Sequence, residues 1–392
     1  MIHCDALIVG GGPAGLAAAI ALRQKGLDVL VADSLRPPID KACGEGLMPD
    51  AQKDLGALGI QVTAHDGVAF DGIAFLAGRH QVAAHFEHGS GIGIRRLHLH
   101  SLLLERCRQL GVRLSWGSRV NVAESQPLSL DGEACTYRYA IGADGQSSRM
   151  RQAIRIGQGK VVSRRFGTRC HYRVKPWSRM VEVHWGNLGQ AYITPVGREE
   201  ICVATVSRSS ATRMEAVLAD LPALREHLQG AVQLSTLRGA LTTTRKLPRV
   251  TAGNVALTGD ASGSADAVTG EGIGLSFRHA LLLAEAVAVD NLALYEVGHP
   301  AIQRMPHLMS RVMLRMDAWP WMRERAMSFL SGQPQFFAHL LAVHLGERSL
   351  GDFLLEQFAI GLDRSERPFR GFPPRKTTPR DLHQAKGIAK LL

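Results

Sequence analysis

Three glycines near the start of the chain have the spacing of a phosphate-binding turn. Gly10, Gly12 and Gly15 follow the apolar run 6–9, which predicts a buried parallel strand, and precede an Ala- and Leu-rich stretch that predicts a helix. In such a turn the first glycine permits the sharp bend, the second lets the backbone approach a pyrophosphate, and the third lets helix and strand touch. The positive end of the helix then faces the phosphates.

A carboxylate at the end of the next predicted strand completes this pattern. Residues 28–32 predict that strand, and it delivers Asp33 to the same edge of the sheet. An acidic residue at this place is suited to the ribose hydroxyls of an adenine nucleotide. Pro13 and Ala14, which open the helix, belong to the same predicted site. A strand–helix–strand unit without a ligand is the alternative, but strand, glycines, helix and acid all have the spacing that the fingerprint requires.

Two later strand ends also carry acidic residues and glycines. The predicted strand 137–143 ends in Asp144, and another predicted strand delivers Gly259 and Asp260. Asp260 can accept hydrogen bonds from sugar-like hydroxyls. The glycine-rich segment 270–274 then opens a long predicted helix, whose first N–H groups can stabilise negative charge on a ring. An ordinary strand, turn and helix is the alternative.

A cysteine and an arginine are further candidates. Cys43 and Gly44 lie in a glycine-rich loop that can pass closely over a flat ligand. Cys43 is the single candidate for a catalytic residue, and a small buried thiol is the alternative. Arg96 lies where a strand turns into a helix, so it can pair with phosphate oxygens, or it is a solvated surface residue. His98 and His100 are two apart and need not share a helix face, so no metal site is predicted.

Composition limits the classes of function. The 392 residues carry 46 Lys and Arg against 35 Asp and Glu, a net charge of +11, which favours acidic ligands or a negative surface. No recognised nucleic-acid-binding module is visible, so no nucleic acid is predicted as a partner. The six cysteines are scattered without a Cys-x-x-Cys pair, which favours reduced thiols and a cytoplasmic location.

The order of these elements predicts an α/β fold with a Rossmann-like nucleotide-binding domain, an inserted antiparallel β-sheet for the substrate and a helical C-terminal region. The predicted boundaries are 1–160 for the nucleotide domain with a small strand-rich segment at about 62–90, 161–250 for the inserted sheet, 251–290 for the return to the nucleotide domain, 291–363 for the helical region and 364–392 for a basic tail.

The C-terminal region also has features that suit a lipophilic environment. An apolar stripe from Ile302 to Trp319 has helical spacing and predicts a packing face, with a lipophilic substrate or a membrane surface as the alternative. The tail 364–392 is basic and rich in proline, so it could be attracted to anionic lipid. A peripheral membrane contact through this region is therefore a further possibility.

Three motifs in this order resemble the FAD-dependent monooxygenases of the para-hydroxybenzoate hydroxylase fold, whose superfamily includes flavin halogenases and geranylgeranyl reductases. The motifs are Gly10-x-Gly-x-x-Gly with Asp33, Asp144-Gly-x-x-Ser-x-x-Arg, and Gly259-Asp with 270–274, and the resemblance covers about residues 1–289. It implies FAD as the cofactor and NADH or NADPH as the electron donor. The cofactor-binding residues that it implies are Gly10, Gly12, Pro13, Ala14, Gly15, Asp33, Cys43, Gly44, Arg96, Asp144, Gly259, Asp260, Gly270, Gly272, Ile273 and Gly274.

The resemblance leaves two reactions open. The favoured one is a monooxygenase that uses NAD(P)H and O2 to hydroxylate or epoxidise an apolar aromatic or polyketide-like small molecule. The other is saturation of isoprenoid double bonds, because Cys43-Gly44 and 269–273 look like the geranylgeranyl reductases. That family's Tyr-x-Trp-x-Phe-Pro-type segment is only Tyr192-Ile-Thr-Pro here. A third hypothesis, of another class, is a non-enzymatic basic protein that binds nucleic acid or membrane through its tail.

Overall fold

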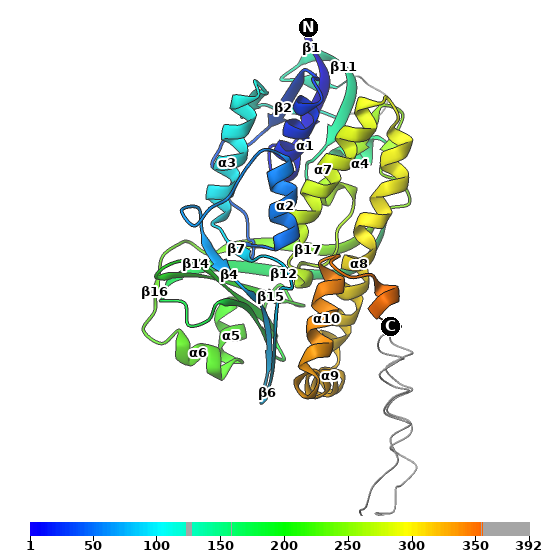
Figure 1. Ribbon diagram of the computed structural model, residues 1–392. Coiled ribbons are helices and arrows are strands. Elements are labelled where there is room, and N and C mark those ends of the chain that lie inside the picture. The colour runs from blue at the N-terminus through cyan, green and yellow to red at the C-terminus, as the bar shows by residue number, and fades with distance from the viewer. Residues whose placement is uncertain (123–127, 158, 354, 356–392) are drawn as a thin grey trace, which may run out of the picture.

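A computed structural model describes residues 1–122, 128–157, 159–353 and 355 (Figure 1). Three sheets form its framework. In Figure 1 the first sheet and its helices occupy the upper part, the second sheet crosses below them, and the C-terminal helices stand beside the second sheet. A mainly parallel sheet and a mainly antiparallel one thus lie next to each other.

The first sheet has the strand order β18-β19-β11-β1-β2-β8, and β9 and β10 extend it beside β11. Its strands are β1 Ile2–Val9, β2 Val29–Asp33, β8 Arg113–Trp116, β9 Val120–Asn121, β10 Ser129–Leu130, β11 Glu133–Gly142, β18 Thr251–Ala252 and β19 Val255–Leu257. Strands β19, β11, β1, β2 and β8 run parallel. Because both faces of such a sheet are covered, Ala6, Leu7 and Ile8 are completely buried.

The helices packed around this sheet bring the glycine motifs to its edge. They are α1 Pro13–Gln24, α2 Pro49–Ala57, α3 Arg96–Gln109, α4 Arg149–Ala153 and α7 Gly272–Ala288, and the short 3-10 turns are η1 Gly259–Ser262 and η2 Ala267–Thr269. Helix α1 starts directly after the predicted turn. A Cβ atom on Gly15 would lie 1.8 Å from the carbonyl oxygen of Gly10, so helix and strand touch here as the spacing predicts.

The second sheet has the order β16-β12-β15-β14-β13-β5-β6, with β17 beside β12. Its strands are β5 Gly72–Ala77, β6 His80–His85, β12 Lys160–Arg173, β13 Met180–Trp185, β14 Gly189–Gly197, β15 Glu200–Ser207, β16 Val232–Gln233 and β17 Arg238–Lys246. Two of these strands, β5 and β6, come from the segment 62–90, and β5 pairs with β13 in parallel. The far face is covered by α5 Met214–Ala219 and α6 Pro222–His227.

A small third sheet, of β3 Gly46–Leu47, β4 Val68–Phe70 and β7 Gly91–Gly93, connects the loop after Cys43 to α3. The chain then closes with α8 Leu292–Ala318, α9 Pro320–Gly332 and α10 Pro334–His344. Side chains from these helices form one apolar cluster with the second sheet, in which the Phe75 and Phe337 rings are 5.0 Å apart.

The predicted apolar stripe on α8 is a packing face over most of its length. Met309 and Met316 are buried, whereas Trp319 is 47% exposed. Among the described helices, none combines the length and the apolarity that crossing a bilayer would need. The basic tail 364–392 lies outside the described residues.

Candidate active site

A cavity of about 690 Å³ lies between the first and second sheets, and most of the predicted cofactor residues line it. Those residues are Gly10, Gly12, Pro13, Ala14, Asp33, Cys43, Gly44, Arg96, Asp144, Gly259, Asp260, Gly270, Gly272 and Ile273. Gly15 and Gly274 do not line it. They permit close packing instead, because Cβ atoms there would meet Gly10 and, at 2.9 Å, the Cβ of Ala51 on α2.

The glycine turn leaves a cradle that a side chain would fill. Gly10 has φ of +114°, and a Cβ there would lie 2.4 Å from the carbonyl oxygen of Ala143, so only glycine fits. Around a Cβ on Gly12, by contrast, no atom of the described chain lies within 4 Å. The space beside Gly12 opens into the cavity at the N-terminus of α1, which is the shape that a pyrophosphate needs.

Asp33 is fixed at the mouth of this cradle by two backbone donors. The N–H of Gly11 donates to its Oδ2 at 2.7 Å, and the N–H of Leu35 donates to its Oδ1 at 2.8 Å. These bonds hold the carboxylate at the end of β2, and each oxygen keeps a further lone pair for a ligand hydroxyl. Asp33 lines the cavity, so the geometry fits a ribose.

Two buried polar atoms along the cavity have no hydrogen-bond partner among the described residues. They are Nε of Arg96 and Oδ1 of Asp144. Buried polar groups are nearly always satisfied, so these two atoms are suited to a polar ligand. Further along, Lys41 Nζ lies 3.5 Å from Oδ2 of Asp260. Lys41 also lines the cavity, and the sequence interpretation missed it because no motif marks it.

The N-terminus of α7 supplies backbone donors at the far end of the cofactor residues. Gly270 has φ of +71°, and a Cβ on Gly272 would meet no described atom within 4 Å. The first N–H groups of this 17-residue helix have no intrahelical acceptor. Glu271 between the glycines turns away from the cavity toward His344, 3.4 Å distant, and burial raises its pKa to about 8.

The remaining part of the cavity belongs to the second sheet and is mainly apolar, with Thr194 among its lining residues. Val181, Tyr192, Ala204 and Val206 face it from β13, β14 and β15. The Tyr192 hydroxyl donates to the carbonyl oxygen of Val268 at 3.2 Å, and burial raises the pKa of this phenol. This part is therefore a chamber for an apolar molecule beside the N-terminus of α7.

Strand β12 forms the floor of this chamber and is anchored by charged residues on either side of a glycine. Since side chains alternate along a strand, Arg165, Gly167 and Arg169 share the face toward the first sheet. Nη1 of Arg165 lies 3.3 Å from Oδ1 of Asp266, and Arg169 donates to Asp40. Both guanidinium groups are buried. Gly167 lies between the two anchors and leaves the floor open.

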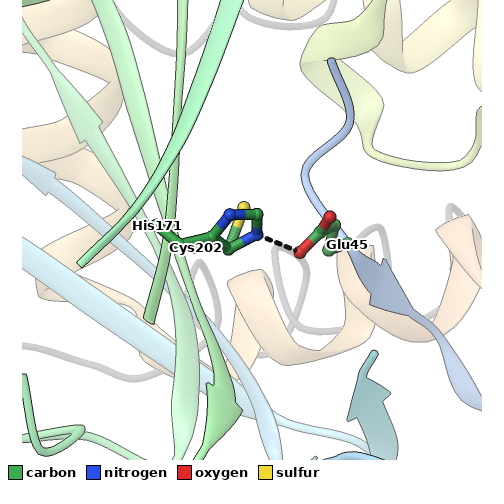
Figure 2. Close-up of side chains that lie close together, drawn as sticks. All are labelled: Glu45, His171 and Cys202. Atoms are coloured by element: carbon green, nitrogen blue, oxygen red, sulfur yellow. Dashed lines mark hydrogen bonds and ion pairs between the residues drawn. The ribbon is translucent and has the colours of Figure 1, made fainter. Parts of the chain in front are cut away.

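Beside Arg169, three buried side chains of metal-ligand type lie together: Glu45, His171 and Cys202 (Figure 2). His171 Nε2 is 2.7 Å from Glu45 Oε2. However, Arg169 Nε and Arg95 Nε lie 3.8 and 4.0 Å from the same carboxylate. Two guanidinium groups at this distance already balance the carboxylate and repel a further cation, so the cluster is better suited to protons than to a metal.

Cys43, the predicted catalytic candidate, lies beside this cluster. It lines the cavity, and its sulfur accepts a hydrogen bond from the N–H of Glu45 at 3.4 Å. His100 is buried with Nε2 2.9 Å from the carbonyl oxygen of Gly11, whereas His98 pairs with Asp66 on the surface. The two histidines therefore point to different partners.

The sequence matches a known protein family over most of its length. The family model described as FAD binding domain matches residues 3–290. Menaquinone reductase of Mycobacterium tuberculosis (strain ATCC 25618 / H37Rv) is 27% identical over 325 residues, which are 74% of this chain and 78% of that protein.

Two solved structures show the same fold at low sequence identity. The p-nitrophenol 4-monooxygenase PnpA of Pseudomonas putida DLL-E4 has a TM-score of 0.75 and 17% identity, over 88% of this chain and 98% of that one. A geranylgeranyl bacteriochlorophyll reductase-like protein of Thermoplasma acidophilum has a TM-score of 0.71 and 17% identity, over 92% of this chain and 100% of that one. The predicted fold class is confirmed.

Proposed function

Because the chain belongs to the FAD binding domain family, we propose that it is a FAD-dependent monooxygenase that takes electrons from NADH or NADPH. It inserts one oxygen atom of O2 into an apolar aromatic or polyketide-like small molecule. FAD, when bound, supplies the redox chemistry, and the protein binds it, orients the substrate and excludes water.

Different residues along the cavity bind different parts of FAD. The backbone at Gly12 and the N-terminus of α1 hold the pyrophosphate, Asp33 holds the adenosine ribose, and Arg96 pairs with the phosphate chain. Asp260, held by Lys41, accepts hydrogen bonds from the ribityl hydroxyls. The N–H groups at 270–273 stabilise negative charge on the flavin ring. The free Arg96 Nε and the open space at Gly12 support this assignment.

The observation that carries the proposal is the apolar chamber next to the N-terminus of α7. Its walls include Val181, Ala204 and Val206, and the one charged group among its lining residues on this side, Asp266, is paired with the buried Arg165. Such a chamber binds an apolar ring by burial and keeps water from the reacting atoms.

A second candidate reaction is the reduction of isoprenoid double bonds. Cys43 supports it, because this thiol lines the cavity in the loop that looks like the geranylgeranyl reductases. The similarity to a menaquinone reductase supports it too, because menaquinone carries an isoprenoid chain.

One experiment separates these reactions. The protein is reconstituted with FAD, and NAD(P)H oxidation is followed with a panel of apolar phenols, polyketides and prenyl quinones. The reactions are run under ¹⁸O2, and the mass of each product is measured by mass spectrometry. A gain of one labelled oxygen supports the monooxygenase, and a gain of two hydrogens supports the reductase. Cys43→Ala leaves the first activity nearly unchanged and impairs the second, with Cys4→Ala as the matched control. A protein that stays colourless after reconstitution refutes both.

The C-terminal region supports one further proposal, contact with a negatively charged lipid surface that holds such a substrate. Trp319 and Trp321 are 47% and 63% exposed at the junction of α8 and α9, with their rings stacked 6.3 Å apart. Tryptophan is suited to the membrane–water interface.

A further inference from the structure

Three side chains form a hydrogen-bonded chain from the protein surface to the cavity. His171 on β12 places Nε2 2.7 Å from Glu45 Oε2, and its Nδ1 lies 2.7 Å from Oγ of Ser235. Ser235 is half-buried in the loop between β16 and β17, whereas His171 and the Glu45 side chain are almost completely buried. Glu45 belongs to the loop that lines the cavity, and Figure 2 shows its carboxylate directed at the imidazole.

The charges around Glu45 fix the direction of these bonds. Arg169 Nε and Arg95 Nε are within 4.0 Å of its carboxylate, and the N–H of Arg96 donates to Oε1 at 3.0 Å. Three N–H groups thus surround the carboxylate, whose oxygens act as hydrogen-bond acceptors. Nε2 of His171 therefore carries the proton and donates it to Glu45.

The other ring nitrogen is then the acceptor. Nδ1 of His171 accepts from the Ser235 hydroxyl, and Nη1 of Arg169, which can only donate, lies 3.4 Å from the same nitrogen. Two thiols also lie beside these residues. Cys170 Sγ donates to the carbonyl oxygen of Ser235 at 3.1 Å, and Cys202 donates to the carbonyl oxygen of Cys43, with its pKa raised by burial. Cys202 therefore stays a neutral thiol beside the chain.

Both reactions considered above consume one proton from solvent in each turnover. A hydroxylation converts substrate, O2, NAD(P)H and one proton into hydroxylated substrate, NAD(P)⁺ and water, and saturation of a double bond by NAD(P)H also takes up one proton. We propose that Ser235, His171 and Glu45 are the proton inlet of the cavity. This inference rests on the proposed oxidoreductase function, in either of its two forms.

The transfer balances without any further reactant. The Ser235 hydroxyl gives its proton to Nδ1 of His171 and regains one from a hydronium ion of the solvent, which leaves water. Nε2 of His171 gives its proton to Glu45, which becomes a neutral carboxylic acid and releases a proton into the cavity. His171 is then neutral with its proton on Nδ1, and a reorientation of the ring that breaks both hydrogen bonds carries this proton to the Glu45 side before the next cycle.

His171→Gln and Ser235→Ala test the inlet by kinetics. Glutamine still donates to Glu45 but cannot pass a proton on. Under single-turnover conditions we expect proton uptake in His171→Gln, followed with a pH indicator, to slow by about 100-fold. We also expect a larger solvent isotope effect, partial rescue by imidazole and unchanged FAD affinity. Ser235→Ala changes the rate and the isotope effect in the same direction.

Matched controls lie elsewhere on the second sheet. His184 makes a buried pair with Glu182 at 2.9 Å on the opposite face, and Ser178 is a half-buried hydroxyl outside the cavity. His184→Gln and Ser178→Ala keep wild-type proton uptake. Rates within twofold of wild type in both test variants overturn the inlet. So does a loss in His171→Gln without a change in isotope effect, since it marks a structural role.

A second measurement does not depend on turnover. In the FAD-free protein, ¹⁵N correlation spectra of the His171 ring show a protonated Nε2 and an unprotonated Nδ1 at neutral pH, and Ser235→Ala shifts the Nδ1 resonance. The opposite tautomer overturns the inlet even if the enzyme is active. If instead no substrate stimulates NAD(P)H oxidation, the proposed function fails. The tautomer of the His171 ring still decides whether the three hydrogen-bonded side chains are arranged to transfer protons inward.

Discussion

Gly167→Leu tests whether the chamber above β12 holds the substrate. Gly167 lines the cavity between the anchored residues Arg165 and Arg169. A Cβ at this position would lie 3.6 Å from the carbonyl oxygen of Ala240 and 3.7 Å from that of Thr205, which are ordinary contacts. The strand therefore accepts a side chain here, and the added atoms enter the chamber.

The size of the effect follows from the volume that the substrate loses. Leucine adds four carbon atoms to the floor, so about four carbons of an apolar substrate lose their buried place. At about 0.8 kcal/mol for each buried CH2 group, the loss is about 3 kcal/mol. This free energy corresponds to a decrease of about 100-fold in kcat/KM for the substrate.

The assay compares three proteins: wild type, Gly167→Leu and the control Gly239→Leu. Gly239 lies on β17 of the same sheet, is exposed and does not line the cavity, and a Cβ there has its nearest described neighbour 3.9 Å away. FAD affinity and melting temperature stay at the wild-type values in both variants, and only Gly167→Leu loses kcat/KM. If Gly167→Leu loses FAD instead, or keeps full activity, the chamber is not the substrate site.

Four further predictions concern cofactor binding, helix packing, pH and membrane contact. Gly12→Ala keeps the fold but weakens FAD binding by about 100-fold, measured by flavin fluorescence, because the methyl group displaces a charge-assisted hydrogen bond. Gly15→Ala unfolds the protein in circular dichroism, since its Cβ would lie 1.8 Å from the carbonyl oxygen of Gly10; a folded Gly15→Ala refutes the packing. Burial lowers the pKa of His299 to about 4, below its unfolded value of about 6.5. The unfolding free energy from urea titrations therefore falls by up to about 3 kcal/mol between about pH 6.5 and pH 4, and less in His299→Gln; equal slopes contradict this cause. Replacing Trp319 and Trp321 by Ser reduces sedimentation with anionic vesicles by about tenfold, and equal sedimentation of wild type and variant excludes this contact surface.

The cofactor side of the cavity could be predicted because local rules dictate it. Gly10, Gly12 and Asp33 lie at one strand–turn–helix unit, and the carboxyl ends of parallel strands bring Asp144 and Asp260 to the same edge. The spacing of these residues along the chain predicts their places, because each motif depends only on its own strand and on the parallel order of the sheet.

The substrate side could not be predicted in the same way. The strands β5 and β6 join the second sheet through β13, about 100 residues later in the chain. Glu45 meets His171 across 126 residues, and no motif relates their types. The alternation of Arg165, Gly167, Arg169 and His171 along β12 was the available signal, because three polar side chains on one strand face require partners when that face is buried.

The buried charges of β12 explain how two sheets form one site. An ion pair such as Arg165 with Asp266 is costly to desolvate, so it contributes less to stability than apolar packing could. It does fix direction, because a guanidinium donates only at defined angles. Arg165 ties β12 to the loop before α7, and Arg169 ties it to the loop of Glu45. The same strand thus sets the distance between these two cavity-lining loops and the chamber floor at Gly167, which apolar side chains could not do with the same precision.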